Sequence, residues 1–137
     1  MKIKILLFSL VFALSTFISM AQEGHKIVFQ MTTNDTLAHK ALMKQLKNIK
    51  SVSPTTSIEV VCHGPGIDML TAGKTIVQAK IKEATENGVE FKVCEFSLKE
   101  RKVEKSAIIP ESGFTPAGII EIVSKVEQGY VYIKAGF

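Results

Sequence analysis

The chain has 137 residues, with 17 basic and 13 acidic side chains and a net charge of +4. Two of the basic residues, Lys2 and Lys4, lie in an apolar N-terminal segment, so the rest of the chain is closer to neutral. This balance argues against nucleic acid or an anionic membrane as a partner. The length is enough for one domain with a single core and too short for two ordinary domains.

The N-terminus, MKIKILLFSLVFALSTFISMAQ, has the pattern of a secretory signal peptide. A short positive region precedes an apolar stretch over residues 5–18, and small residues follow at the position of a cleavage site. The apolar stretch is shorter than the roughly 20 residues that a transmembrane helix needs. We therefore expect a signal peptide over residues 1–21 and cleavage between Ala21 and Gln22. The mature domain, residues 22–137, is expected in the periplasm or outside the cell, without a membrane anchor.

The mature sequence alternates strand-like and helix-like segments. Strands are predicted over residues 26–31, 57–63 and 89–94, near Phe114, and over residues 130–134. Helical patterns separate them, and strands separated by helices require crossover connections. The sequence therefore predicts a mainly parallel sheet covered on both faces, as in a flavodoxin-like doubly wound α/β domain with strand order 2-1-3-4-5.

The last predicted helix follows Thr115 and Pro116, which have the form of an N-cap and a proline at the first helical position. The helix is expected to end at Gly129. Four of its aliphatic residues are predicted to face the sheet: Ile119, Ile122, Val123 and Val126.

The chain has two cysteines, and both fall at the carboxyl ends of predicted strands. Cys62 ends the second strand and Cys94 ends the third. In the predicted order, the first strand lies between these two. Two inter-strand spacings make about 9.6 Å, which exceeds the limit of roughly 7 Å on the Cα separation in a disulfide. The predicted order therefore disfavours a bridge between Cys62 and Cys94.

Cys94 is the strongest candidate for a reactive residue, because the chain turns from strand to helix directly after it. Its sulfur is expected near free backbone N–H groups, and nearby Lys99 and Arg101 add positive potential that Glu95 opposes. Such surroundings favour the thiolate, the form that attacks, accepts sulfur or binds soft metals. The alternative is that Cys94 is a buried small hydrophobic residue, as most free cysteines are.

The segment VVCHGPGID supplies a second candidate site. His63 has the chemistry of a general base or a metal ligand, and Gly64 and Gly66, around Pro65, allow backbone N–H groups to approach an anion. The alternative is a histidine held in a loop and glycines that serve an ordinary turn. The sequence has no CxxC pair, no Walker lysine and no complete dinucleotide motif, so we expect no metal, nucleotide or other cofactor.

Three segments together resemble the DsrE/DsrF-like family: VVCHGPGIDML, NGVEFKVCEFSLKER and GIIEIVSKVEQGYVYIK. They span nearly the whole mature chain in order. The resemblance implies the flavodoxin-like sheet and a homo-oligomer, either a trimer or a hexamer. It also implies that Cys94, which lies where sulfur-relay members carry their cysteine, receives sulfane sulfur as a persulfide and passes it to a partner protein. Residues 63–66 match the loop that frames the same pocket, and no family function corresponds to Cys62.

These observations lead to one functional hypothesis and two alternatives. The hypothesis is an exported sulfur carrier that forms a persulfide on Cys94, with a donor and an acceptor that the resemblance does not identify. One alternative is a non-catalytic oligomeric module that binds a small ligand or another protein. The other is a thiol sensor that forms intermolecular disulfides.

Overall fold

The structure of the chain is a computed structural model that describes residues 24–136. The predicted signal peptide, residues 1–21, and its cleavage site before Gln22 lie outside the described residues. Within residues 24–136, none of the helices combines the length and the apolar character needed to cross a membrane.

Five strands form one sheet in which every neighbouring pair is parallel. The strands are β1 (Lys26–Met31), β2 (Ser57–Cys62), β3 (Val89–Cys94), β4 (Gly113–Thr115) and β5 (Val131–Ala135). The α-helices are α2 (Thr36–Val52), α3 (Gln78–Glu86), α4 (Glu95–Glu100) and α5 (Gly118–Glu127). Two short 3-10 helices are η1 (Gly64–Leu70) and η2 (Lys105–Ala107). The predicted α/β class with a five-stranded parallel sheet is confirmed.

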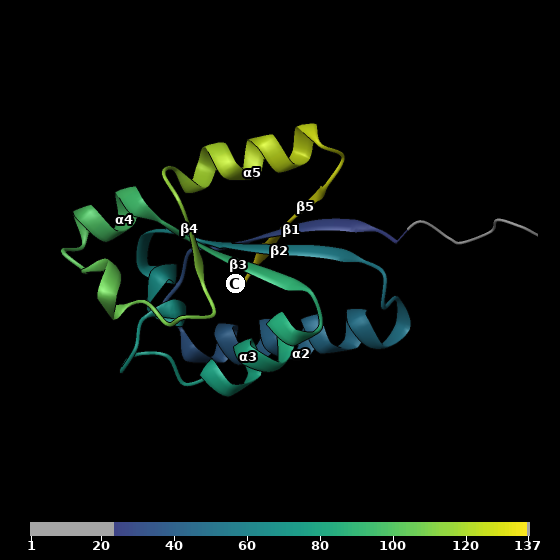
Figure 1. Cartoon of the computed structure of the whole chain (residues 1–137), viewed down its shortest axis with the longest axis horizontal. Helices are drawn as coiled ribbons and strands as arrows, with labels where there is room; N and C mark the ends of the chain where they lie inside the picture. The colour runs from purple at the N-terminus through teal and green to yellow at the C-terminus, as the bar shows by residue number, and fades with distance from the viewer. Residues whose placement is uncertain (1–23, 137) are drawn as a thin grey trace, which may run out of the picture.

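The strand order is β4-β3-β2-β1-β5, which corrects the predicted order 2-1-3-4-5. Right-handed crossovers on the same face carry successive strands in the same direction across a sheet. Figure 1 shows α2 and α3 together below the sheet, so β1, β2 and β3 follow one another in space. Helix α5 lies above the sheet and leads the chain back to the other edge of β1. The alternation of segments predicts the crossovers but not the face on which each helix packs.

Helix α2 shows how the sequence builds the lower layer. It begins where the Asp35 carboxylate accepts a hydrogen bond at 2.8 Å from the backbone N–H of Leu37, an N-cap that satisfies one of the free donors of the first turn. Ala38, Leu42 and Leu46 follow at helical spacing and are buried against the sheet. The Asp35 cap thus starts an amphipathic helix whose apolar side completes the core.

The two faces of the sheet differ in how much apolar material covers them. The larger core lies on the side of α2 and α3, where Phe29, Val60 and Phe91 stand in register on neighbouring strands. The core on the side of α5 is small and consists of Val28, Val61 and Ile122, with Tyr130 packed against it. Most of the hydrophobic stabilisation of the domain therefore comes from the α2–α3 side.

Helix α5 departs from its prediction in both its start and its packing. It begins at Gly118, after Ala117 as N-cap, and therefore later than Pro116. Of the four residues expected to face the sheet, only Ile122 is buried. The other three are about half exposed: Ile119, Val123 and Val126. The stripe that meets the sheet runs through Gly118, Ile122 and Lys125, so the helix turns its only glycine and a lysine inward and several aliphatic residues outward.

Candidate functional site

Cys94 lies at the carboxyl end of β3, where it is also the N-cap residue of α4. Its side chain is buried, with 5% of the residue exposed. The backbone N–H of Gly118, the first residue of α5, donates a hydrogen bond to Cys94 Sγ at 3.2 Å. The Phe96 N–H donates to the Pro116 carbonyl at 3.3 Å and joins α4 to the segment that precedes α5. Two helix starts, far apart in sequence, thus meet at this sulfur.

The surroundings of Cys94 favour its thiolate. Burial acts to raise the pKa of the Cys94 thiol, but hydrogen bonds from the Ser97 side chain and from the backbone N–H groups of Gly118, Ser97 and Phe96 outweigh it. The net effect is a pKa below the ordinary value of a cysteine. Because these donors point at the sulfur, they stabilise negative charge on it, which is the condition for a reactive cysteine.

Cys62 lies in different surroundings, although its strand is the direct neighbour of β3. This proximity corrects the prediction that β1 separates the two cysteines. Cys62 is in register with Val93, so Cys94, one residue further, points to the opposite face of the sheet. Cys62 packs in the α2–α3 core, and burial raises the pKa of its thiol. Both cysteines are free, and the sheet itself keeps their side chains apart.

Gly118 allows α5 to approach the site closely. A Cβ atom at this position would lie 3.1 Å from His63 Cβ, 3.2 Å from Cys94 Cβ and 3.3 Å from Val61 Cγ1. The glycine therefore sits between His63 and Cys94 and brings its N–H group to the sulfur. A side chain at this position would push the start of α5 away from the site by a few tenths of an ångström.

His63 follows β2 directly and lies on the same side of the sheet as Cys94. Its backbone N–H donates to the Met31 carbonyl at 3.1 Å, and its ring Nε2 lies 2.7 Å from Gln30 Nε2. Burial lowers the pKa of His63, so the neutral imidazole predominates at neutral pH. Across residues 24–136, no group of three or more His, Cys, Asp and Glu side chains is placed to hold a metal ion.

The glycines of the same loop fix its path. Gly64 has a φ of 53°, in the left-handed region, and its N–H donates to Ser97 Oγ at 2.8 Å. A Cβ on Gly66 would lie 2.1 Å from the Met31 carbonyl oxygen, so only glycine fits there. Pro65 occupies the first turn of η1, where its lack of an N–H group costs nothing. The loop is thereby tied to Ser97 and to the Cys94 edge of the sheet.

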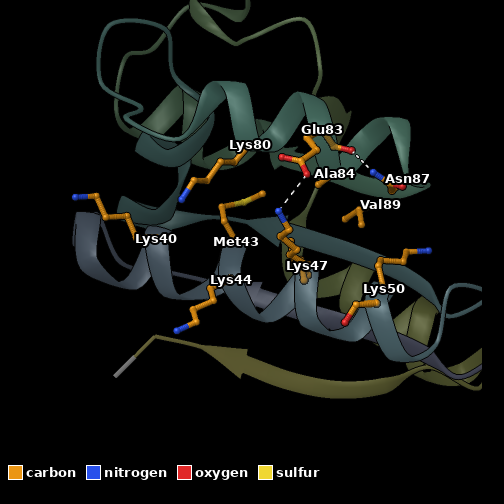
Figure 2. A pocket seen from close by; sticks show the side chains of 12 residues that line it. Lys40, Met43, Lys44, Lys47, Lys50, Lys80, Glu83, Ala84, Asn87 and Val89 are labelled. Carbon is orange, nitrogen blue, oxygen red and sulfur yellow. Dashed lines mark hydrogen bonds and ion pairs between the residues drawn. The ribbon is translucent and has the colours of Figure 1, made fainter.

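A separate groove of about 550 Å³ lies between α2 and α3 on the other side of the sheet. Figure 2 shows Lys40, Lys44 and Lys80 along its rims. The Lys47 ammonium lies 3.6 Å from a Glu83 carboxylate oxygen and spans the groove. Neither cysteine nor histidine is among its lining residues. This groove is thus distinct from the site around Cys94.

The sequence profile of the DsrE/DsrF-like family matches residues 25–135. The chain belongs to the DsrE/DsrF-like family. A solved structure of a protein of unknown function from Methanobacterium thermoautotrophicum shares 22% identity over 80% of this chain and 98% of its own, with a TM-score of 0.76. Another from Bacteroides thetaiotaomicron shares 17% identity over 85% and 98%, with a TM-score of 0.66. Both share the fold. The search of curated proteins found no match.

The structure of this DsrE/DsrF-like chain also contains site residues that the sequence analysis missed. These are Gln30, Ser97, Gly118 and Tyr132. Each of these residues makes a hydrogen bond to a residue on another element, so no local sequence pattern predicts its role. The one signal available was Gly118 itself, a glycine in the first turn of a predicted amphipathic helix, where close approach of another backbone or side chain is a common reason for its presence.

Proposed function

We propose that this chain carries sulfane sulfur as a persulfide on Cys94. The observation that supports this most strongly is the hydrogen bond from the Gly118 N–H to Cys94 Sγ, in a setting that lowers the pKa of the thiol. A thiolate is the form that attacks a sulfur donor. Membership in the DsrE/DsrF-like family agrees with this chemistry.

The transfer requires no external oxidant. The Cys94 thiolate attacks the outer sulfur of a persulfide or thiosulfate donor and forms a new S–S bond. The S–S bond of the donor breaks, and its electron pair leaves with the donor thiolate or with sulfite. An acceptor thiolate then attacks the outer sulfur on Cys94 in the same way and releases Cys94 as thiolate. Each step exchanges one S–S bond for another, so the protein ends as it began.

Sulfur loading can be measured directly on the reduced protein. Incubation with polysulfide or thiosulfate should add about 32 Da, one sulfur atom, to the peptide that contains Cys94. Cys62→Ser should load like the wild type, and Cys94→Ser should not load. Sulfur on Cys62, or on neither residue, would contradict the assignment. Failure at both would favour a non-catalytic binding module.

The pH dependence of alkylation tests the thiolate independently of any sulfur donor. Because the pKa of Cys94 is lowered and that of Cys62 is raised, Cys94 should react at neutral pH while Cys62 reacts only on unfolding. We expect the rates in the native protein to differ by at least about 100-fold, because the pKa of one thiol is lowered and that of the other is raised by burial. Equal rates would refute the assignment.

We also propose that the chain forms a homo-oligomer, a trimer or a hexamer, through α5 and β5. Exposed aliphatic and aromatic residues gather on these elements: Ile119, Ile120, Val123, Val126, Val131, Tyr132 and Ile133. Exposed apolar side chains in such number are typical of an interface. Light scattering should show an oligomer at micromolar concentration. Ile120→Lys should weaken it, whereas Val52→Lys, at an exposed position on α2, should not; a wild-type monomer would refute the proposal.

We further propose that the chain is exported and begins at Gln22 in its mature form. The charged and apolar segments of residues 1–21 support this. Mass spectrometry of the protein from the periplasm or the medium should give the mass of residues 22–137. Recovery of the intact N-terminus there would refute the cleavage.

A further inference from the structure

Three polar side chains form a hydrogen-bonded row across the α5 side of the sheet. They come from three neighbouring strands or their ends: Tyr132 on β5, Gln30 on β1 and His63 after β2. The Tyr132 hydroxyl donates to Gln30 Oε1. At the other end of the same amide, Gln30 Nε2 lies 2.7 Å from His63 Nε2. The row therefore ends at the histidine that flanks Gly118 opposite Cys94.

With the Gln30 amide oriented as it is in the structure, the donors and acceptors in this row leave a single arrangement of protons. An amide oxygen can only accept, so Tyr132 must be the donor to Gln30 Oε1. The amide nitrogen can only donate, so His63 Nε2 must accept and carries no proton. A neutral imidazole has one N–H group, which must then be at Nδ1. The lowered pKa of His63 agrees with a neutral ring.

We propose that Gln30, oriented by Tyr132, holds His63 as the Nδ1–H tautomer and so provides a hydrogen-bond donor for an anionic sulfur ligand at Cys94. Within residues 24–136 no hydrogen bond to Nδ1 is recorded, which leaves this donor available. A Cβ atom on Gly118 would contact both His63 Cβ and Cys94 Cβ, so these two residues are near neighbours and a ligand at the sulfur is close to the ring. Gln30 and Tyr132 act as positioning residues. The tautomer stands on geometry alone, whereas its use by a sulfur ligand rests on the proposed function.

The chain contains an internal reference with the opposite tautomer. His39 Nε2 lies 2.8 Å from the Thr33 carbonyl oxygen. A carbonyl only accepts, so His39 carries its proton on Nε2. His39 is buried on α2, away from the row of Tyr132, Gln30 and His63, and changes in that row should leave it unaffected. One spectrum of one protein can therefore show both tautomers side by side.

The test is a long-range proton–nitrogen correlation spectrum of the ¹⁵N-labelled protein at neutral pH. The pattern of cross-peaks shows which ring nitrogen carries the proton. We expect Nδ1–H for His63 and Nε2–H for His39. An Nε2–H pattern for His63, or rapid exchange between both tautomers in the wild-type protein, overturns the proposal. Because this measurement uses the wild type, it does not depend on whether a variant folds.

Gln30→Glu sharpens the test, because a carboxylate can only accept. Nε2 of His63 should then become the N–H donor, and the pKa of His63 should rise by at least about one unit as the carboxylate stabilises the imidazolium. Tyr132→Phe frees the amide to rotate, so both tautomers should become populated. His39 should keep its pattern in both variants. An unchanged His63 pattern in Gln30→Glu would refute the positioning role.

Sulfur loading separates this inference from the proposed function. If His63 donates to the anionic sulfur, Gln30→Glu should slow loading of Cys94 by roughly tenfold, the effect of one lost hydrogen bond, when loading is measured at a pH above the raised pKa of His63, where the ring is neutral and Nδ1 carries no proton. An unchanged loading rate overturns the ligand role of His63. If the wild-type spectrum shows the expected tautomer but Cys94 never loads, the sulfur function fails while the assignment of the tautomer stands.

Discussion

The two faces of the sheet are formed by the same strands but carry different kinds of side chain. The side of α2 and α3 holds a continuous apolar core that includes Cys62. The side of α5 holds a small apolar cluster and, beside it, three polar pairs: Glu59 with Lys125, Gln30 with His63, and Cys94 with Gly118. Because strand residues alternate between faces, a one-residue step decides which of these surroundings a side chain enters. The face covered by α2 and α3 supplies most of the hydrophobic stabilisation, and the face covered by α5 carries the polar and ionisable side chains of the candidate site.

The Glu59 carboxylate is the clearest sign of this difference. It is almost fully buried beneath α5, and Lys125 Nζ lies 2.9 Å from one of its oxygens. The two side chains thus form a close ionic contact. Burial raises the pKa of Glu59 to about 6 in spite of Lys125. Such a group opposes folding when it is charged.

The largest expected effect comes from shortening a side chain on the apolar face. Leu42→Ala should lower the free energy of unfolding by about 3 kcal/mol, because it leaves a cavity in a closely packed core. Ile122→Ala, in the small cluster under α5, should cost about half as much, because fewer apolar groups surround it. Urea denaturation of both variants measures the difference. Equal losses would show that the two faces contribute alike.

A second effect, of about 2 kcal/mol, should appear in the dependence of stability on pH. The pKa of Glu59 is about 6 in the folded chain against 4.5 without the surroundings of the fold. Between these values the unfolded chain has lost the proton while the folded chain keeps it, so this group lowers stability as the pH rises through the window. Glu59→Gln removes the change.

The prediction is tested on the difference in the free energy of unfolding between the wild type and Glu59→Gln. Contributions that both proteins share, such as that of His63, cancel in this difference. Chemical denaturation at several pH values between 4 and 7 gives the two curves. Parallel curves would mean that Glu59 keeps an ordinary pKa and that the polar face is better solvated than its burial indicates.

The smallest expected effect comes from Gly118→Ala, which tests the contact between α5 and the sulfur. The added methyl group would lie at 3.1 to 3.3 Å from its neighbours, so the helix start must shift by a few tenths of an ångström. We expect a loss of about 1 kcal/mol in stability and a higher pKa of Cys94, because the N–H donor moves away from Sγ. Alkylation at neutral pH should slow accordingly.

Ala117→Gly provides the matched control, since it changes the residue beside Gly118 without adding an atom near the sulfur. It should leave the alkylation rate of Cys94 unchanged. If Gly118→Ala alkylates as fast as the wild type, the Gly118 N–H does not contribute to the thiolate.

Local patterns predicted the secondary structure well because strands and caps depend on nearby residues. The strand over residues 26–31 was predicted with the bounds that β1 has, and β3 likewise coincides with residues 89–94. The strand order was wrong, because it depends on which face each helix covers, and that choice is made by packing over the whole domain. The predicted inward face of α5 was wrong, because a pattern of apolar residues indicates the buried face of a helix only where all of the apolar residues face the core.

The candidate site was predicted only where the chain itself carries the signal. Cys94 and the loop of residues 63–66 were identified from a strand end and from glycines. Their partners were not, because Gly118 and Tyr132 approach from positions distant in sequence. A reactive cysteine can thus be suggested by its local context, but the groups that adjust its pKa and orient its neighbours depend on the tertiary fold.

The burial of Cys94 limits which molecules can reach its sulfur at this edge of the sheet. With 5% of the residue exposed, the bare thiolate is shielded from bulky reagents. If a second sulfur were bonded to Sγ, about 2 Å away, the transferable atom would lie further from the buried position of Cys94 than the thiolate does. An acceptor would then reach that atom more easily than a donor reaches the bare thiolate.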